Sequence, residues 1–439
     1  MDWHCLGHAM WLAEASGLRL LFDPLLDDAH HGGVFRVFPG RTIDAAALRP
    51  DFVFVSHRHP DHFDPRSLRR LAELDPDSVL VTPDPLVGEI AELVGFRSVR
   101  LVGAETTIDL DGPRLVTTPS PHATDPEWGL LVATEDGVVW NQVDTSLGRA
   151  DDVERFFETA ALALARPRAK LVTLALARWQ PLLEVAAFTA GDIGFPFEAY
   201  AAELEHVVAV DPAVVCPSAA GACHAAPFAA SNALVYPLGE ARFARDLKRR
   251  APAIDIVENV VGATYRVRDG RVEVDTRGAI ASGLVAGVQS DIADPRAYRP
   301  LAVPELVDPN ASGEREVALV ARIERWVDDE LRPALDAQPP FARLLEVVLP
   351  SETRRYPFGG SADAWDLRCA VAGSLLVEVL DGRLHWGDLL LAGMLRGATR
   401  AYTIDAHGLR RAPEQPLFVY HALSYEESAR RAAFSSARP

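Results

Sequence analysis

Residues Phe52–His62 have the sequence FVFVSHRHPDH, in which an apolar run leads directly into a cluster of potential metal ligands. The run Phe52–Val55 is built from aromatic and β-branched residues, which is typical of a buried strand. The loop that follows supplies four potential ligands within six residues: His57, His59, Asp61 and His62. Because a loop at the carboxyl end of a strand can turn such side chains inward, this stretch predicts a metal site at the edge of a sheet.

The donor types narrow the choice of metal. Imidazole nitrogens and carboxylate oxygens suit zinc, iron or manganese, whereas calcium and magnesium prefer shells made of oxygen alone. Four donors are more than one tetrahedral ion needs when it also binds water, so the spacing favours two ions. The alternative is a polar loop whose histidines are merely solvated. The pattern H-x-H-x-D-H placed straight after a buried strand favours the metal site.

Composition restricts the partners of the protein. The chain has 439 residues, 49% of them hydrophobic and 24% charged, which is typical of one or two globular domains. Its 44 Lys and Arg face 62 Asp and Glu, so the formal charge of −18 argues against binding to nucleic acid. No stretch is as long and apolar as a membrane span, and the first residues do not read as a signal peptide. We therefore expect a cytoplasmic protein.

The cysteines predict no metal cluster of their own. Cys5, Cys216, Cys223 and Cys369 are widely scattered, and even the nearest two are too far apart for a C-x-x-C ribbon or a Rieske centre. We expect buried free thiols in a reducing compartment.

Further candidate ligands follow other predicted strands. His122 lies in the loop PSPHATDPEWG, Asp144 follows the strand in VVWNQVDTS, and His224 follows a strand at Ala213–Cys216. Asp23 directly follows the predicted strand Leu18–Phe22. Taken singly, each of these would be an ordinary loop histidine or a capping acid.

The pattern of elements predicts an α/β sandwich. Trp3–Glu14 and Leu18–Phe22 are expected to be two strands joined around Gly17, and Pro65–Glu73 is expected to be a helix capped by Asp64. Alternating helices and strands then give way to shorter antiparallel segments. This change predicts two mixed sheets flanked by helices.

A stretch rich in Pro and Asp, residues 291–313, suggests a linker. We therefore divide the chain into a metal-binding catalytic domain, residues 1–295, and a smaller α+β C-terminal region, residues 296–439, that covers it. Within that region, Glu314–Leu335 is expected to be helical and Asp366–Leu380 to form strands.

The motif HRHPDH is similar to the signature of the metallo-β-lactamase superfamily. Beyond it, HRHPDHFDPRSLRRLA, HATDPEWGLLV and NQVDT resemble stretches of CMP-N-acetylneuraminate hydroxylase outside its Rieske domain. The resemblance implies a metallo-β-lactamase αβ/βα fold and seven ligands to two divalent transition metals: His57, His59, Asp61, His62, His122, Asp144 and His224. It places His57, His59 and His122 on one ion and Asp61, His62 and His224 on the other, with Asp144 bridging them. Val143 stands where the superfamily usually has glycine.

Two activities remain open at this point. The resemblance implies a non-haem, probable di-iron oxygenase that hydroxylates a small polar metabolite, with Asp61 and Asp144 in catalytic roles and iron, Fe(II)/Fe(III), as the metal. Since the sequence has no Rieske domain, O₂ chemistry would need electrons from an external ferredoxin or reductase. The alternative is a zinc or manganese hydrolase in which the metal activates water to attack a lactone, amide or phosphoester. A third hypothesis is a binding module without catalysis.

The walls of a substrate site are expected from two loops, residues 24–41 and 176–196. Arg36, Arg178 and Trp179, and also Arg41, could hold an anionic or aromatic group of the substrate. Each of them could equally be an ordinary surface or packing residue.

Overall fold

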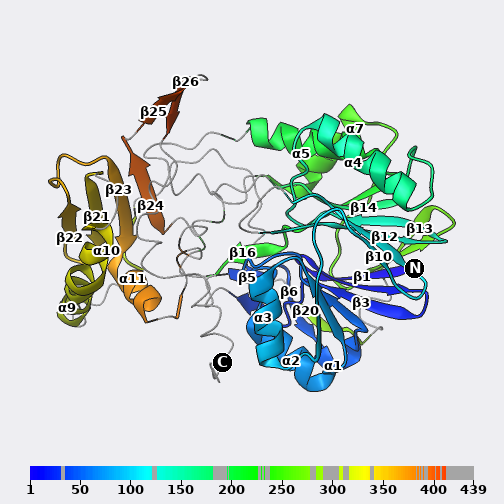
Figure 1. Cartoon of the computed structure of the whole chain (residues 1–439), viewed down its shortest axis with the longest axis horizontal. Helices are drawn as coiled ribbons and strands as arrows, with labels where there is room; N and C mark the ends of the chain where they lie inside the picture. The colour runs from blue at the N-terminus through cyan, green and yellow to red at the C-terminus, as the bar shows by residue number, and fades with distance from the viewer. Residues whose placement is uncertain are drawn as a thin grey trace.

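The computed structural model describes two bodies, a larger one with most of the elements and a smaller one near the C-terminus (Figure 1). The described residues are 1–30, 35–120, 126–180, 195, 197–225, 229, 232, 238–276, 283–289, 306–309, 316–336, 341–381, 383–384, 386, 389, 394–400, 402–405 and 408–411.

The first sheet of the larger body has eight strands in the order β19-β18-β1-β2-β3-β7-β8-β9. The strands are β1 (Asp2–Gly7), β2 (Met10–Ala15), β3 (Leu18–Phe22), β7 (Phe52–Phe54), β8 (Val79–Thr82), β9 (Ser98–Leu101), β18 (Thr264–Arg268) and β19 (Arg271–Asp275). Strands β3, β7, β8 and β9 run parallel, whereas the others pair antiparallel. The predicted strand at Phe52 therefore lies among parallel neighbours.

The second sheet has seven strands in the order β10-β11-β12-β13-β14-β15-β17. The strands are β10 (Thr107–Asp109), β11 (Arg114–Thr117), β12 (Leu130–Thr134), β13 (Gly137–Asn141), β14 (Leu174–Arg178), β15 (Val214–Ser218) and β17 (Asp255–Ile256). It is antiparallel as far as β13 and parallel from there onward.

Helices cover the outer face of each sheet, so the larger body has four layers (Figure 1). The first sheet is covered by α1 (Ala45–Leu48), α2 (Pro65–Leu74) and α3 (Pro85–Val94), and the second by α4 (Ala150–Ala163), α5 (Phe197–Val210) and α7 (Glu240–Arg250). Asp64 caps α2 by accepting from the amide of Ser67 at 3.0 Å, as predicted. The predicted α/β sandwich of two mixed sheets is confirmed.

Aromatic side chains fill the space between the two sheets. The ring of Phe22 is stacked between those of Trp3 and Phe54, with centroid distances of 5.1 Å on each side. Leu130 and Leu176 of the second sheet belong to the same buried cluster. Phe54 thus points into this core, while its neighbour Val53 packs towards the helices. Such alternation, with both faces buried, explains why the strand reads as an unbroken apolar run.

The expectation of one strand over Trp3–Glu14 is wrong. The chain turns between β1 and β2, where Gly7 has a φ of 102° and His8 a φ of 52°. A Cβ on Gly7 would lie 2.9 Å from Arg41 Cδ, so glycine is required there for space as well as for conformation. The residues on both sides of the turn are apolar, so the sequence lacks the run of polar residues that usually marks a turn.

Two small sheets lie at the edge of the larger body. Strands β4 (Ala29–His30), β5 (Phe35–Val37) and β16 (Ala222–His224) form one, and β6 (Gly40–Ile43) pairs with β20 (Val285–Gln289) in the other. They bring the 24–41 segment beside the strand that carries His224.

The smaller body contains a four-stranded sheet in the order β22-β21-β23-β24. Its elements are α9 (Glu316–Trp326), the π-helical turn η5 (Val327–Leu331), α10 (Arg332–Asp336), β21 (Arg343–Val348), β22 (Thr353–Phe358), β23 (Leu367–Ala372), α11 (Gly373–Leu380) and β24 (Leu395–Thr399), with a hairpin of β25 (Tyr402–Asp405) and β26 (Gly408–Arg411) beyond them.

The expectation of strands over Asp366–Leu380 is half wrong, since Gly373–Leu380 is a helix. A short apolar run has no period that separates strand from helix, and packing decides its form. The predicted boundary between residues 295 and 296 lies outside the described residues, so the division into two domains stays a prediction.

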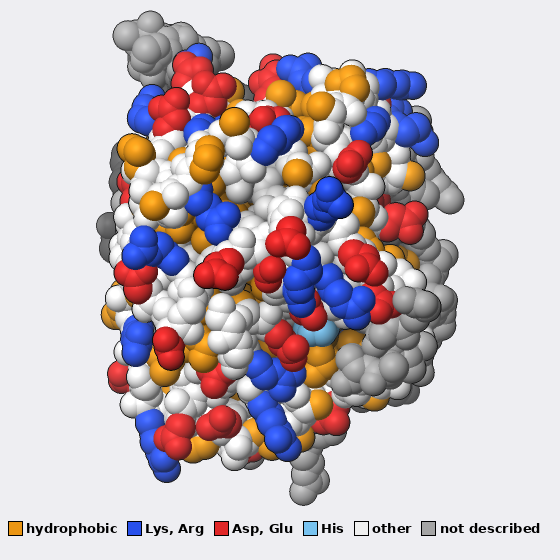
Figure 2. Space-filling model, turned by 90° about the vertical axis from the view of Figure 1, so that its right-hand side faces the viewer, with side chains coloured by type: hydrophobic (Ala, Val, Ile, Leu, Met, Phe, Trp, Pro, Cys, Tyr) orange, Lys and Arg blue, Asp and Glu red, His pale blue; other side chains and the backbone are white. Residues whose placement is uncertain are grey.

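The described helices are all too short or too polar to cross a lipid bilayer. Figure 2 shows one face of the molecule, on which basic and acidic side chains are intermixed. This face offers no continuous basic surface of the kind that nucleic acid binding requires.

A buried arginine fastens the β1–β2 turn. The side chain of Arg41 on β6 is fully buried and donates from Nε to the carbonyl of Leu6 at 2.5 Å. It also donates to the carbonyl of Leu25 and, at 2.7 Å, to the carboxylate of Asp28. These contacts give Arg41 a packing role, in place of the predicted contact with substrate.

Replacement of Arg41 by Met should destabilise the fold. The substitution leaves the carbonyls of Leu6 and Leu25 without this donor and removes the ion pair with Asp28, which should cost about 3 kcal/mol in the free energy of unfolding. Urea unfolding followed by circular dichroism would measure this cost. Arg36→Met is a matched control, because Arg36 is exposed on the neighbouring strand β5 and should change stability by less than about 0.5 kcal/mol. Equal effects of the two substitutions would contradict the role of Arg41.

Candidate metal centre

The predicted metal loop turns back on itself directly after β7. The amides of His62 and Phe63 both donate to the carbonyl of His59, each at 2.9 Å. This tight turn, followed at once by the capped start of α2, directs the side chains of the loop towards one place at the carboxyl end of the strand. The local sequence therefore produces the convergence that the spacing predicted.

Six side chains form two groups of potential ligands. In each group the ligand atoms lie within 4.8 Å of one another: His57, His59 and Asp144 form one group, and His8, Asp61 and His62 form the other. His62 joins the two groups, because its Nε2 lies 3.3 Å from Asp144 Oδ2 and 3.4 Å from Asp61 Oδ2. The rings of His57 and His62 have centroids 4.4 Å apart. Imidazole and carboxylate donors gathered in this way fit a pair of transition-metal ions.

Two predicted ligands lie elsewhere. His122 is outside the described residues. His224 is buried on β16, where its ring centroid lies 4.3 Å from that of Phe35, and it belongs to neither group of donors. The assignment of these two histidines to metal stays a prediction.

His8 was missed by the sequence analysis. It lies in the β1–β2 turn, is 4% exposed, and its Nε2 is 3.3 Å from Asp61 Oδ2. Its ring centroid lies 5.3 Å from that of His62. The one signal in the sequence is a histidine that follows glycine inside an apolar run.

The charges of the cluster are strongly coupled. Burial opposes the charged form of His62, but the carboxylates of Asp61 and Asp144 outweigh burial and raise the pKa of His62 well above its usual range. Burial, together with the imidazoles of His62 and His59, lowers the pKa of His57 well below its usual range. Burial would raise the pKa of Asp144, but His62 and then Arg178 hold that pKa below its usual range. Asp144 and His57 thus favour the deprotonated forms that bind metal, whereas His62 favours its protonated form and would release a proton on binding an ion.

Asp23 holds the ring of His62 from behind. Its Oδ2 lies 3.0 Å from His62 Nδ1, and its two oxygens accept from the amide and the hydroxyl of Ser56 at 2.8 and 2.9 Å. A carboxylate on one ring nitrogen fixes the orientation of the other. Nε2 of His62 therefore points at Asp61 and Asp144.

Arg58 links the metal loop, through an ion pair, to the junction between β8 and α3. Its Nε and Nη2 donate to the two carboxylate oxygens of Asp84, at 2.5 and 2.8 Å. Asp84 is fully buried and caps α3 through the amide of Leu86. A bidentate pair of this kind fixes the position of a loop more firmly than a single contact does.

The turn that carries Asp144 is strained and well supported. Val143 has a φ of 56°, a left-handed conformation that a β-branched residue rarely adopts and that glycine adopts readily. Arg178 donates from Nη1 to the carbonyl of Asp144 at 2.9 Å, and its amide donates to Gln142 Oε1 at 3.0 Å. The guanidinium also pairs with the carboxylate of Glu203 at 3.4 Å. Arg178 thus positions Asp144.

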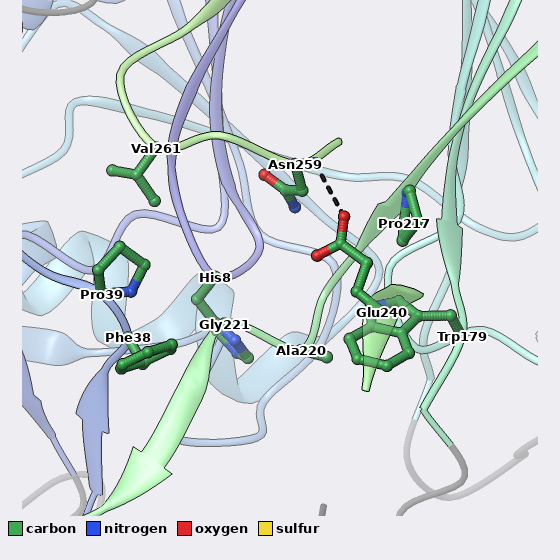
Figure 3. A pocket seen from close by; sticks show the side chains of 10 residues that line it. All are labelled: His8, Phe38, Pro39, Trp179, Pro217, Ala220, Gly221, Glu240, Asn259 and Val261. Carbon is green, nitrogen blue, oxygen red and sulfur yellow. Dashed lines mark hydrogen bonds between the residues drawn. The ribbon is translucent and has the colours of Figure 1, made fainter. Parts of the chain in front are cut away.

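The residues predicted to bind substrate have different surroundings. Arg178 has the contacts just described, Arg36 is exposed on β5, and Trp179 is buried with its ring centroid 6.2 Å from that of Phe243. Trp179 also lines a small cavity that reaches from His8 to Glu240 (Figure 3). Contact of Arg36, Arg178 and Trp179 with substrate stays a prediction.

Residues 3–148 match the model of a beta-lactamase superfamily domain. This part of the chain is similar to that superfamily. The match contains His8, the metal loop and Asp144, and it confirms the family predicted from HRHPDH. It also agrees with the observed arrangement of two mixed sheets between helices, so the predicted metallo-β-lactamase fold is confirmed.

Two curated relatives match parts of the chain. A Rieske 2Fe-2S iron-sulfur protein of Mycolicibacterium smegmatis is 35% identical over 97 residues, which are 21% of this chain and 18% of that protein. A metal-dependent hydrolase of Pyrobaculum aerophilum is 28% identical over 153 residues, which are 33% of this chain and 61% of that protein. The chain thus spans less than two thirds of either relative. The Rieske relative fits the predicted resemblance to CMP-N-acetylneuraminate hydroxylase.

Solved structures with a similar fold include proteins of both chemical classes. The diiron β-hydroxylase CmlA of Streptomyces venezuelae has 16% identity and a TM-score of 0.40, covering 59% of this chain and 52% of that one. The metallo hydrolase Igni18 of Ignicoccus hospitalis has 14% identity and a TM-score of 0.39, covering 62% of this chain and 97% of that one.

Replacement of Asp23 by Asn should weaken metal binding without removing a ligand. The substitution takes away the negative charge that orients His62, and we expect the affinity for metal to fall about 10- to 100-fold. Competition against a chromophoric chelator would measure the affinity. Asp109→Asn, which alters an exposed ion pair with Arg114, is the control and should leave the affinity unchanged. An unchanged affinity in the Asp23 variant would show that His62 needs no support from this acid.

Proposed function

We propose that this protein is a dinuclear metalloenzyme and, within that class, a non-haem di-iron oxygenase that hydroxylates or otherwise oxidises a small polar metabolite. The observation that carries the proposal is the contact of two groups of donors through His62, whose Nε2 faces Asp61 and Asp144 at 3.4 and 3.3 Å. One group alone would favour a single ion. Two groups in contact favour a pair of ions.

The donor set suits iron as well as zinc or manganese. His57 and His59 would hold one ion, with the predicted His122 as a further ligand, and Asp61 and His62 would hold the other, while Asp144 lies between the two groups. Bound iron would supply redox chemistry with O₂ in a site of imidazole and carboxylate ligands that leaves positions open. The described thiols are buried and belong to neither group.

Neighbouring residues of the protein hold these donors in position. Asp23 holds Nδ1 of His62, so the second ring nitrogen stays directed at the carboxylates. Arg178 holds the carbonyl of Asp144, so the carboxylate stays at the junction of the two groups. His57 and His62 are 3% and 0% exposed, which strengthens their charge interactions, whereas His59 is exposed.

The choice of an oxygenase rests on the Rieske relative and on the resemblance to CMP-N-acetylneuraminate hydroxylase. The reaction with O₂ would need a supply of electrons, for which a ferredoxin or reductase is the proposed source. The substrate would be a small molecule rather than nucleic acid, in keeping with the net charge of −18.

The second candidate is a zinc or manganese hydrolase that acts on a lactone, an amide or a phosphoester. The metal-dependent hydrolase of Pyrobaculum aerophilum favours it, since the match of 153 residues is longer than that with the Rieske protein. The same donors would serve, because carboxylate and imidazole also suit an ion that activates water.

Replacement of single ligands should show which residues hold each of the two ions. His57→Ala and His59→Ala should each remove metal and activity while the fold survives, because both side chains belong to the same group of donors. Asp144→Asn should lower the occupancy of both ions together, since it removes the negative charge shared by the two groups. Plasma emission spectrometry of the purified variants would count the metals. Loss of one ion alone from the Asp144 variant would refute its bridging role.

Metal identity and oxygen uptake should distinguish the two activities. The chain purified from iron-replete cells should contain about two iron ions and show uptake of O₂ with a ferredoxin, a ferredoxin reductase and NADPH. An oxygen electrode would measure the uptake, and the His57→Ala variant would serve as the inactive control. Zinc as the sole metal, with hydrolysis of a chromogenic lactone or phosphodiester and no uptake of O₂, would favour the hydrolase.

A further inference from the structure

We propose that His8, rather than the predicted His224, is a ligand of the second metal ion and shares that ion with Asp61 and His62. The inference rests on the proposed dinuclear function and adds to it a ligand from the first hairpin of the chain. None of the superfamily motifs in the sequence contains this residue.

The distances between the donors are those of ligands around one ion. His8 Nε2 and His62 Nε2 lie 3.3 and 3.4 Å from Asp61 Oδ2. Two ligands that each bind an ion at about 2.1 Å in tetrahedral directions stand roughly 3.4 Å apart. A direct hydrogen bond between an imidazole and a carboxylate is typically shorter, at about 2.7 to 2.9 Å. The separations of His8 and His62 from Asp61 are similar to each other and longer than such a hydrogen bond. They therefore favour a shared ion.

The backbone of the turn is shaped to present this side chain. His8 has a φ of 52°, a conformation that most residues avoid and that histidine adopts more often than most. Such strained residues persist where the surroundings determine them completely, and they concentrate at functional sites. This backbone conformation directs the imidazole of His8 towards Asp61 and away from the core around β1 and β2.

Close packing of neighbouring segments fixes the backbone of His8. A Cβ on Gly221 would lie 2.8 Å from the amide nitrogen of His8 and 2.9 Å from its Cα, so the β15–β16 connection presses directly on the turn. Figure 3 shows His8 and Gly221 side by side at the rim of the small cavity. On the other side, Arg41 holds the carbonyl of Leu6. The turn is thus fixed from two directions before any ion binds.

His224 lies in a different environment. Its ring packs on Phe35, and its backbone amide and carbonyl are both bonded to the side chain of Asn232, at 2.6 and 3.1 Å. These contacts hold the backbone of His224 on β16, and its ring nitrogens belong to neither group of donors. The second group reaches three protein ligands with His8 and without His224.

Counting metals in variants of the full chain would test the assignment. His8→Asn is the main variant, because asparagine tolerates a positive φ and should keep the turn intact. We expect this variant to retain about one ion, against about two in the natural chain, when each is loaded with Fe(II) or Co(II). Mössbauer spectra should change from those of a coupled iron pair to those of an isolated iron.

Two control variants test whether a change in the number of bound ions is specific to His8. His4 lies on β1, before the turn that carries His8, and its Nδ1 contacts Thr264 Oγ1 on β18, so the His4→Asn variant should retain both ions. His224→Ala should also retain both. Circular dichroism would verify that each variant is folded, and His8→Ala would repeat the measurement without any amide oxygen that could replace the imidazole.

The possible outcomes separate this inference from the proposed function. Two ions and a coupled pair in both His8 variants would overturn the inference and leave the dinuclear function intact. Loss of one ion from the His224 variant, with both kept in the His8 variants, would overturn it in favour of the predicted ligand. Fewer than two ions in the natural chain would instead refute the dinuclear function itself.

Discussion

The imidazole of His62 lies among the carboxylates of Asp23, Asp61 and Asp144, in a place that is almost wholly buried. Each buried charge costs several kcal/mol in lost hydration, so such a group of acids is stable only around a cation. A proton on His62 can serve in this way, and a metal ion bound by Nε2 would serve better. The need to neutralise these acids links the architecture of the domain to the chemistry of the site.

Three arginines hold the three loops that bring the donors together. Arg58 fastens the metal loop to Asp84, Arg178 fastens the turn of Asp144, and Arg41 fastens the turn of His8. Arg178 and Arg41 each bind a carbonyl close in the chain to a donor residue, whereas Arg58 itself lies in the metal loop and binds a distant carboxylate. The donors are therefore positioned before an ion binds, which lowers the cost of assembling the site.

The sequence predicted those parts of the site whose signals are local. The metal loop, its preceding strand and the cap of α2 lie within about twenty residues, and each has its own chemical pattern. His8 is different, because its turn lies between two apolar strands and is set by packing against Arg41 and Gly221, which are distant in sequence. Helix α11 was misjudged for the same reason, since packing rather than an apolar period decides its form.

The charge of the site has a consequence for the substrate. Two divalent ions would bring four positive charges to a cluster whose carboxylate ligands, Asp61 and Asp144, contribute two negative ones, while Asp23 contacts His62. The excess of positive charge would favour an anionic group of the substrate or a negatively charged oxygen ligand. Bound iron would supply oxygen chemistry at this cluster, and bound zinc or manganese would supply the activation of water. The same cluster can therefore serve either reaction, and the electrons delivered to it would decide between them.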